Sequence, residues 1–391
     1  MIDQRLIEYM QEALKTTPTG FHRYMYDNVL WDDRMFGIIG PRGIGKSTMV
    51  KQYILQQANP ADWLYVSADH IYFSEHSLSR LASDMVKENM HHLVVDEIHR
   101  YPGWSTELKM IYDIYPSLQI IFTGSSILDI RKGCADLSRR VLIFEMQGLS
   151  FREYLRLFKD IILPVYSLDD ILSGKTTFPC DFHPLPLFRE YLRNGYYPFG
   201  KLAGYELRLQ QVISQTIEGD IPQFAGMSIA VARKLKRLLT IVAGLAPFKP
   251  SVLNLSAELK VSKNDVPDYL MYLEMSGMIG QLRDDTGGLR GLGKVEKVYV
   301  DNTNLMYALA DKEPNSGNMR ETFFYNQTRV KYDVMSSKIS DFRIGDCTFE
   351  VGGASKGTRQ LKGADKGYVV RDDIELATRE FIPLWQFGLT Y

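Results

Sequence analysis

Gly40-Pro-Arg-Gly-Ile-Gly45-Lys46-Ser47-Thr48 is the stretch that decides the expected fold, because it matches G-x-x-x-x-G-K-[ST] at every fixed position. It follows the apolar run Met35–Ile39 and leads into an amphipathic segment, so a strand, a glycine-rich turn and a helix are expected. In such a turn backbone N–H groups cradle phosphate oxygens, Lys46 neutralises the β and γ phosphates, and the Ser47 hydroxyl binds Mg²⁺. The predicted phosphate site consists of Gly40, Pro41, Arg42, Gly43, Ile44, Gly45, Lys46, Ser47 and Thr48.

Two adjacent acids end a later apolar strand, His91–Glu97. One acid at the carboxyl end of a strand can bind the coordination shell of Mg²⁺. The next acid can polarise a water for in-line attack on the γ-phosphate. We therefore assign Asp96 to the metal and Glu97 to the water. Many strands end at acidic turn residues, so this assignment depends on the complete phosphate loop that precedes it.

Hydroxyl side chains follow the next apolar run, Gln119–Phe122. A hydroxyl at Thr123, Ser125 or Ser126 would lie beside the γ-phosphate and could sense it. The alternative is that these residues only cap the following helix, since Ser and Thr are common at such turns. The sequence leaves both interpretations open.

A pair of arginines, Arg139 and Arg140, precedes the apolar run Val141–Phe144. A guanidinium there is either a solvated surface group or an arginine finger that reaches the γ-phosphate of a neighbouring subunit. The finger would make catalysis depend on self-association, and the sequence does not choose between the two.

Composition is that of a folded globular chain of 391 residues, with 45% hydrophobic and 24% charged residues and a formal net charge of −1. No overall positive field draws it to nucleic acid, so such binding would need a local basic patch. The three scattered cysteines, Cys134, Cys180 and Cys347, indicate a reducing compartment, and we expect the cytoplasm. No apolar run is long enough to span a membrane.

Five short apolar runs alternate with amphipathic stretches in the first third of the chain, which is typical of a parallel sheet covered on both faces. We expect an α/β, three-layer P-loop domain there, then helices, a winged helix-turn-helix and a small α/β domain. The expected boundaries are 1–155 for the P-loop domain, 156–225 for a helical lid or connector, 226–300 for the winged-helix-like domain and 301–391 for the last domain.

Several motifs together resemble a family of AAA-type ATPases of bacteria and archaea that join a P-loop domain to a C-terminal domain of uncharacterised function. The motifs are Gly40–Thr48, Val95–Trp104, Phe122–Ser126, Leu149–Tyr154 and Tyr191–Phe199. The resemblance implies ATP as the nucleotide, a sensor strand between the phosphate-loop strand and the Mg²⁺ strand, a Ser-Ser sensor, and a fingertip at Arg139 and Arg140.

The same resemblance implies a C-terminal winged helix followed by a restriction-endonuclease-like fold. Its acidic residues would be Glu321, Asp341 and Glu350, but Gly352 stands where the family pattern has lysine. The cation that such nucleases use is missing unless Lys356 takes its place. We therefore expect a degenerate nuclease site, in a fold kept for binding or architecture.

The function expected from the sequence is Mg²⁺-dependent ATP binding and hydrolysis, coupled to rearrangement of C-terminal interaction domains. One alternative is a nucleotide-gated scaffold with negligible hydrolysis, and another is an ATP-driven DNA-processing enzyme with a C-terminal nuclease. Acidic residues on the expected recognition helix, Asp265, Asp268 and Glu274, favour a protein partner or self-association over DNA. Two basic runs keep nucleic-acid binding open, Arg233–Arg237 and Lys356–Lys366.

Overall fold

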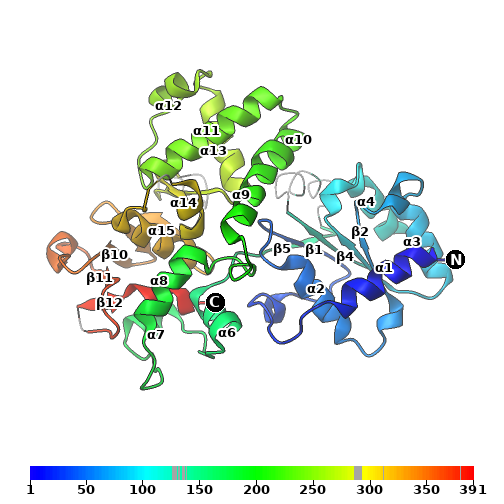
Figure 1. Cartoon of the computed structure of the whole chain (residues 1–391), viewed down its shortest axis with the longest axis horizontal. Helices are drawn as coiled ribbons and strands as arrows, with labels where there is room; N and C mark the ends of the chain where they lie inside the picture. The colour runs from blue at the N-terminus through cyan, green and yellow to red at the C-terminus, as the bar shows by residue number, and fades with distance from the viewer. Residues whose placement is uncertain are drawn as a thin grey trace. The chain divides into compact units, whose positions relative to one another are not determined.

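The structure is a computed structural model that describes residues 1–125, 130, 133, 137, 139–285, 293–310, 312–378 and 380–391. The chain folds into two compact units (Figure 1), an N-terminal unit, Met1–Gln147, and a C-terminal unit, Gly148–Tyr391. Ser126 and Cys134, which the sequence singled out, lie outside the described residues. Among the described residues, no helix combines the length and the apolar character needed to cross a membrane.

The N-terminal unit is built on a parallel five-stranded sheet, as predicted. Its strands are β1 (Met35–Ile39), β2 (Trp63–Ser67), β3 (His92–Asp96), β4 (Gln119–Gly124) and β5 (Leu142–Glu145). The strand order is β2-β3-β4-β1-β5, so β4 separates the phosphate-loop strand from the strand that ends in Asp96. The expected sensor-strand position is therefore confirmed, and the carboxyl ends of β1, β3 and β4 lie at one edge of the sheet.

Helices cover both faces of this sheet, which explains why its central strands are continuous apolar runs. The helices are α1 (Gln4–Lys15), α2 (Lys46–Leu55), α3 (Leu78–Lys87) and α4 (Trp104–Ile114). Leu93 and Val95 of β3 point into a core shared with α3 and α4. Side chains alternate along a strand, so Asp96 points to the opposite face. Helix α2 lies on that face, where its Tyr53 ring packs edge-on against Trp63.

The C-terminal unit contains a second five-stranded sheet, in agreement with the predicted small α/β domain. Its strands are β8 (Val334–Ser336), β9 (Phe342–Ile344), β10 (Cys347–Gly352), β11 (Lys366–Arg371) and β12 (Phe381–Pro383). They lie side by side in chain order, antiparallel from β8 to β10 and parallel from β10 to β12. Helix α15 (Ser316–Thr328) packs on this sheet, and its Phe324 ring lies 5.2 Å from that of Phe349 on β10.

Helices and a hairpin precede that sheet in the C-terminal unit. They are α6 (Phe151–Lys159), α7 (Leu168–Leu172), α8 (Pro184–Asn194), α9 (Tyr205–Gln215), a π-helical segment (Thr216–Asp220), α10 (Ile221–Ala225), α11 (Ile229–Leu245), α12 (Val252–Leu259), α13 (Asp265–Met275), the antiparallel strands β6 (Ile279–Arg283) and β7 (Val295–Val300), and α14 (Thr303–Leu309). The winged helix and the division of this unit into three domains stay predictions.

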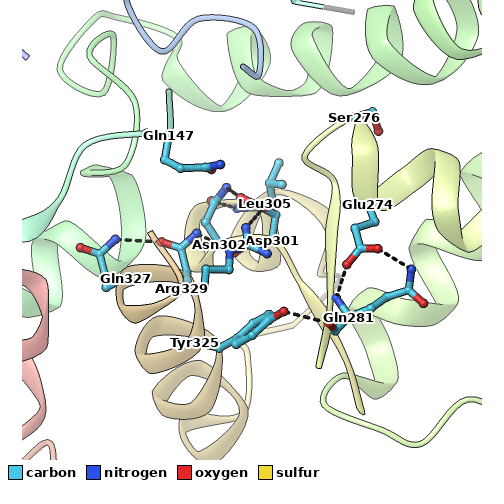
Figure 2. A network of polar contacts seen from close by, with 12 residues as sticks. Gln147, Glu274, Ser276, Gln281, Asp301, Asn302, Leu305, Tyr325, Gln327 and Arg329 are labelled. Atoms are coloured by element: carbon cyan, nitrogen blue, oxygen red, sulfur yellow. Dashed lines mark hydrogen bonds and ion pairs between the residues drawn. The ribbon is translucent and has the colours of Figure 1, made fainter. Parts of the chain in front are cut away.

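Polar side chains connect the hairpin to α13 and α15 (Figure 2). Arg329, which follows α15, donates to the buried Asp301 after β7, and Tyr325 of α15 donates to the carbonyl oxygen of Gln281 at 2.9 Å. The side chain of Gln281 donates in turn to Glu274 of α13 at 2.9 Å. Because these groups are buried or half-buried and hydrogen-bonded, they fix the hairpin against its neighbours instead of destabilising the unit.

Candidate functional site

The predicted phosphate loop connects the end of β1 to Lys46, the first residue of α2. Three of its glycines have positive φ, +151° at Gly40, +78° at Gly43 and +99° at Gly45, and residues with a Cβ adopt such values only with strain. A Cβ at Gly40 would also lie 2.2 Å from the carbonyl oxygen of Met146, next to β5. The shape of the loop therefore depends on its glycines.

Lys46 turns back over this loop. Its Nζ donates to the carbonyl oxygens of Gly40 and Pro41, both at 2.8 Å, and the residue is only 5% exposed. Arg42 and Thr48, two further polar residues of the motif, are half-buried. The ammonium group thus lies at the loop, where phosphates bound by the backbone N–H groups would need positive charge.

Asp96 accepts hydrogen bonds from three side chains of the N-terminal unit. Ser47 Oγ donates to Oδ1 at 2.9 Å, and Thr123 Oγ1 donates to the same oxygen. Tyr65 of β2 donates its hydroxyl to Oδ2 at 2.6 Å. Burial, and then the charge of Asp96, raise the pKa of Tyr65, so this hydroxyl stays a donor. One carboxylate oxygen therefore faces Ser47 at the phosphate loop, and the other is fixed by β2.

Glu97 has a positive φ of 52°, which is uncommon for a residue other than glycine and often marks a functional site. Its Oε2 accepts from Ser125 Oγ at 3.0 Å and lies 3.3 Å from Nε2 of the buried His99. Its backbone N–H donates to Thr123 Oγ1 at 3.3 Å. Two of the predicted sensor residues thus contact the two acids: Thr123 contacts both Asp96, assigned to the metal, and Glu97, assigned to the water, and Ser125 contacts Glu97.

Ser47 and Asp96 fit a magnesium site. Mg²⁺ prefers oxygen ligands, and these two residues bring a hydroxyl and a carboxylate oxygen within 2.9 Å of each other beside Lys46. When bound with a nucleotide, the ion would neutralise charge on the β and γ phosphates. The donor set is thus the one that the sequence assigned to the metal.

The two predicted finger residues differ in their surroundings. Arg140 forms an ion pair with Asp113 of α4, with Nε 3.0 Å from Oδ1. Arg139 is exposed and has a positive φ of 69°. Within one chain, the described contacts of Arg140 are therefore structural, and Arg139 is the better candidate for a contact with another subunit.

Two residues at this site were missed by the sequence analysis, Tyr65 and Arg23. Arg23 is 5% exposed, and its guanidinium donates to the carbonyl oxygens of Ile44 in the loop and, at 2.7 Å, of Gln147 after β5. Its signal in the sequence is one cation among the aromatic residues of Phe21–Tyr26. Tyr65 lies in the middle of the mostly apolar strand β2, and without the strand register its hydroxyl cannot be matched to Asp96.

The residues predicted for the degenerate nuclease site come close together in the C-terminal unit. Glu321 lies on α15, Asp341 directly before β9, and Glu350 on β10. Glu321 and Asp341 line a cavity of about 450 Å³ together with the loop 352–356. Lys297 contacts Glu321 and Asp341, and Lys356 contacts Glu350.

Comparison with known proteins supports the class that this fold and site define. Residues 32–155 match the family model of an AAA domain, and residues 185–316 match a domain of unknown function, DUF8612. The chain thus carries a match to an AAA domain over residues 32–155, which lie mostly in the N-terminal unit, followed by a match to a domain whose role its family model does not define.

Individual relatives are distant. An uncharacterized protein of Methanocaldococcus jannaschii is 27% identical over 258 residues, which cover 61% of this chain and 54% of that protein. This chain thus spans about half the length of the curated relative that it matches. Among solved structures it is similar to a Walker-type ATPase of Pyrococcus abyssi (14% identity, 76% of this chain and 99% of that chain, TM-score 0.47). It is also similar to AMPPCP-bound DnaA from Aquifex aeolicus (15% identity, 70% and 89%, TM-score 0.25).

Proposed function

We propose that the N-terminal unit binds ATP with Mg²⁺ and hydrolyses it. The observation that supports this most directly is the hydrogen-bonded set of Ser47, Asp96 and Thr123 beside the phosphate loop, with Glu97 next to it. In this proposal Lys46 and the loop hold the phosphates, Ser47 and Asp96 hold the metal, and Glu97 orients the attacking water. The choice of ATP rests on the AAA domain match.

We further propose that the state of the nucleotide reaches the C-terminal unit through residues 146 and 147. The phosphate loop touches this segment at two points, since Gly40 packs on the carbonyl oxygen of Met146 and Arg23 bridges Ile44 to Gln147. The next residue, Gly148, begins the C-terminal unit. A change of loop conformation would therefore act on the chain directly before that unit.

The test is phosphate release from ATP by the wild-type chain and by Glu97→Gln, with and without Mg²⁺. We expect the substitution to lower turnover by about 10² or more, because a general base contributes about that much, while nucleotide affinity changes little. Glu12→Gln is the matched control, since Glu12 is an exposed glutamate on α1. It should behave as wild type.

Two other outcomes for the wild-type chain would change this assignment. If the wild-type chain binds ATP without turnover, the nucleotide-gated scaffold replaces the ATPase. If the wild-type chain neither binds nor hydrolyses ATP, the proposal is wrong. Duplex DNA added to the same assay tests the nucleic-acid alternative, which requires that DNA stimulate turnover.

A further inference from the structure

Lys297 of β7 lies between two carboxylates of the C-terminal unit. Its Nζ is 2.8 Å from Glu321 Oε2 and 3.1 Å from Asp341 Oδ1. Burial alone lowers the pKa of Lys297, but the charges of Glu321 and Asp341 outweigh this effect and raise it, so the ammonium stays charged. A cation supplied by the chain itself therefore bridges the two acids.

Lys356 fills space at position 352, where the family pattern has a lysine and this chain has glycine. A Cβ added at Gly352 would lie 2.0 Å from Cγ of Lys356, so the Lys356 side chain runs where a side chain of residue 352 would start. Its Nζ forms an ion pair with Glu350, which is only 2% exposed and also accepts from Ser340 Oγ. Because Gly352 has no side chain, the side chain of Lys356 can occupy this space.

Each of the bridged acids also accepts a hydrogen bond from a second protein donor. Tyr299 donates its hydroxyl to Glu321 Oε2 at 2.9 Å, and the backbone N–H of Val351 donates to Asp341 Oδ2 at 3.0 Å. A divalent ion would have to displace Lys297 to reach Oε2 and Oδ1. Among the described residues, no group of three or more His, Cys, Asp or Glu side chains is arranged to hold a metal.

We infer that Lys297 occupies the position that a divalent cation would take between Glu321 and Asp341, and that the C-terminal sheet works without a metal. A nuclease of the expected type needs that cation to activate water and stabilise developing charge. Lys297 instead ties β7 to α15 and to the start of β9 through its contacts with Glu321 and Asp341. These three side chains are half-buried, and loss of the lysine would leave the two carboxylates without a countercharge. Lys297 and both of its acidic partners belong to the C-terminal unit, so their contacts do not require ATP binding or hydrolysis in the N-terminal unit.

The experiment measures Mn²⁺ binding by electron paramagnetic resonance to the full chain without nucleotide. All variants carry Asp96→Asn, which removes the metal ligand beside the phosphate loop. The parent should show no site at the cluster, whereas Lys297→Met should gain about one Mn²⁺ per chain, because two unpaired carboxylates then face each other. Adding Asp341→Asn to Lys297→Met should remove the gained site.

Lys294→Met is the matched control, because Lys294 precedes the same strand and is exposed. It should bind as little Mn²⁺ as the parent. A parent site that disappears with Glu321→Gln would overturn the inference, and so would a folded Lys297→Met that gains none, with folding checked by circular dichroism. If Lys297→Met does not fold, the parent and its Glu321→Gln variant still decide the question.

Discussion

Tyr65 is placed to fix the orientation of Asp96. Its hydroxyl holds Oδ2 at 2.6 Å while Oδ1 faces Ser47, so the carboxylate cannot rotate freely. We expect Tyr65→Phe to raise the Mg²⁺ concentration needed for half-maximal nucleotide binding by about tenfold. This corresponds to about 1.4 kcal/mol, at the low end for a hydrogen bond to a charged group. Binding of a fluorescent ATP analogue during a Mg²⁺ titration measures the change.

The control for this substitution is Tyr101→Phe in the same unit. Tyr101 also donates to a carboxylate, Glu107 Oε1 at 2.7 Å, but that pair lies outside the predicted site. Both variants should lose some thermal stability, and only Tyr65→Phe should change the Mg²⁺ requirement. An equal change in both would show that Tyr65 has only a structural role.

The phosphate loop depends on Gly40 for its approach to the end of β5. We expect Gly40→Ala to destabilise the chain by about 1–3 kcal/mol, the usual cost of overpacking, because its Cβ would meet Met146 at 2.2 Å. Gly20→Ala is the control, since a Cβ there has nothing within 4 Å and should change stability by less than about 0.5 kcal/mol. Urea unfolding measures both, and equal midpoints would contradict the role given to Gly40.

Elements of the N-terminal unit could be predicted from sequence because their signals are local. Continuous apolar runs mark parallel strands, and the glycine motif marks the turn between β1 and α2. Tyr65 and Arg23 could not be assigned, because their partners are set by the strand register and by a distant carbonyl oxygen. The sequence offers Lys356 as a replacement for the lysine missing at Gly352, but only the backbone conformation shows that its side chain passes over Gly352.

An arginine finger that acts on a second copy of the chain would make ATP turnover depend on self-association. Arg140 is already paired with Asp113, whereas Arg139 is exposed, so a finger acting on a second copy should be Arg139. We expect ATP turnover per chain to rise with protein concentration. Arg139→Ala should abolish that rise, because it removes the positive charge that stabilises the transition state. Arg140→Ala should keep it. Turnover that does not depend on wild-type concentration would rule out a finger in trans.

Arg23 binds the main-chain carbonyl oxygen of Gln147, the last residue of the N-terminal unit. Both of its described acceptors, Ile44 and Gln147, offer main-chain carbonyl oxygens. Every amino acid supplies a main-chain carbonyl oxygen, so the contact of Arg23 does not require a particular side chain at position 147. Evolution could therefore exchange the polypeptide that follows the P-loop domain while this attachment is preserved.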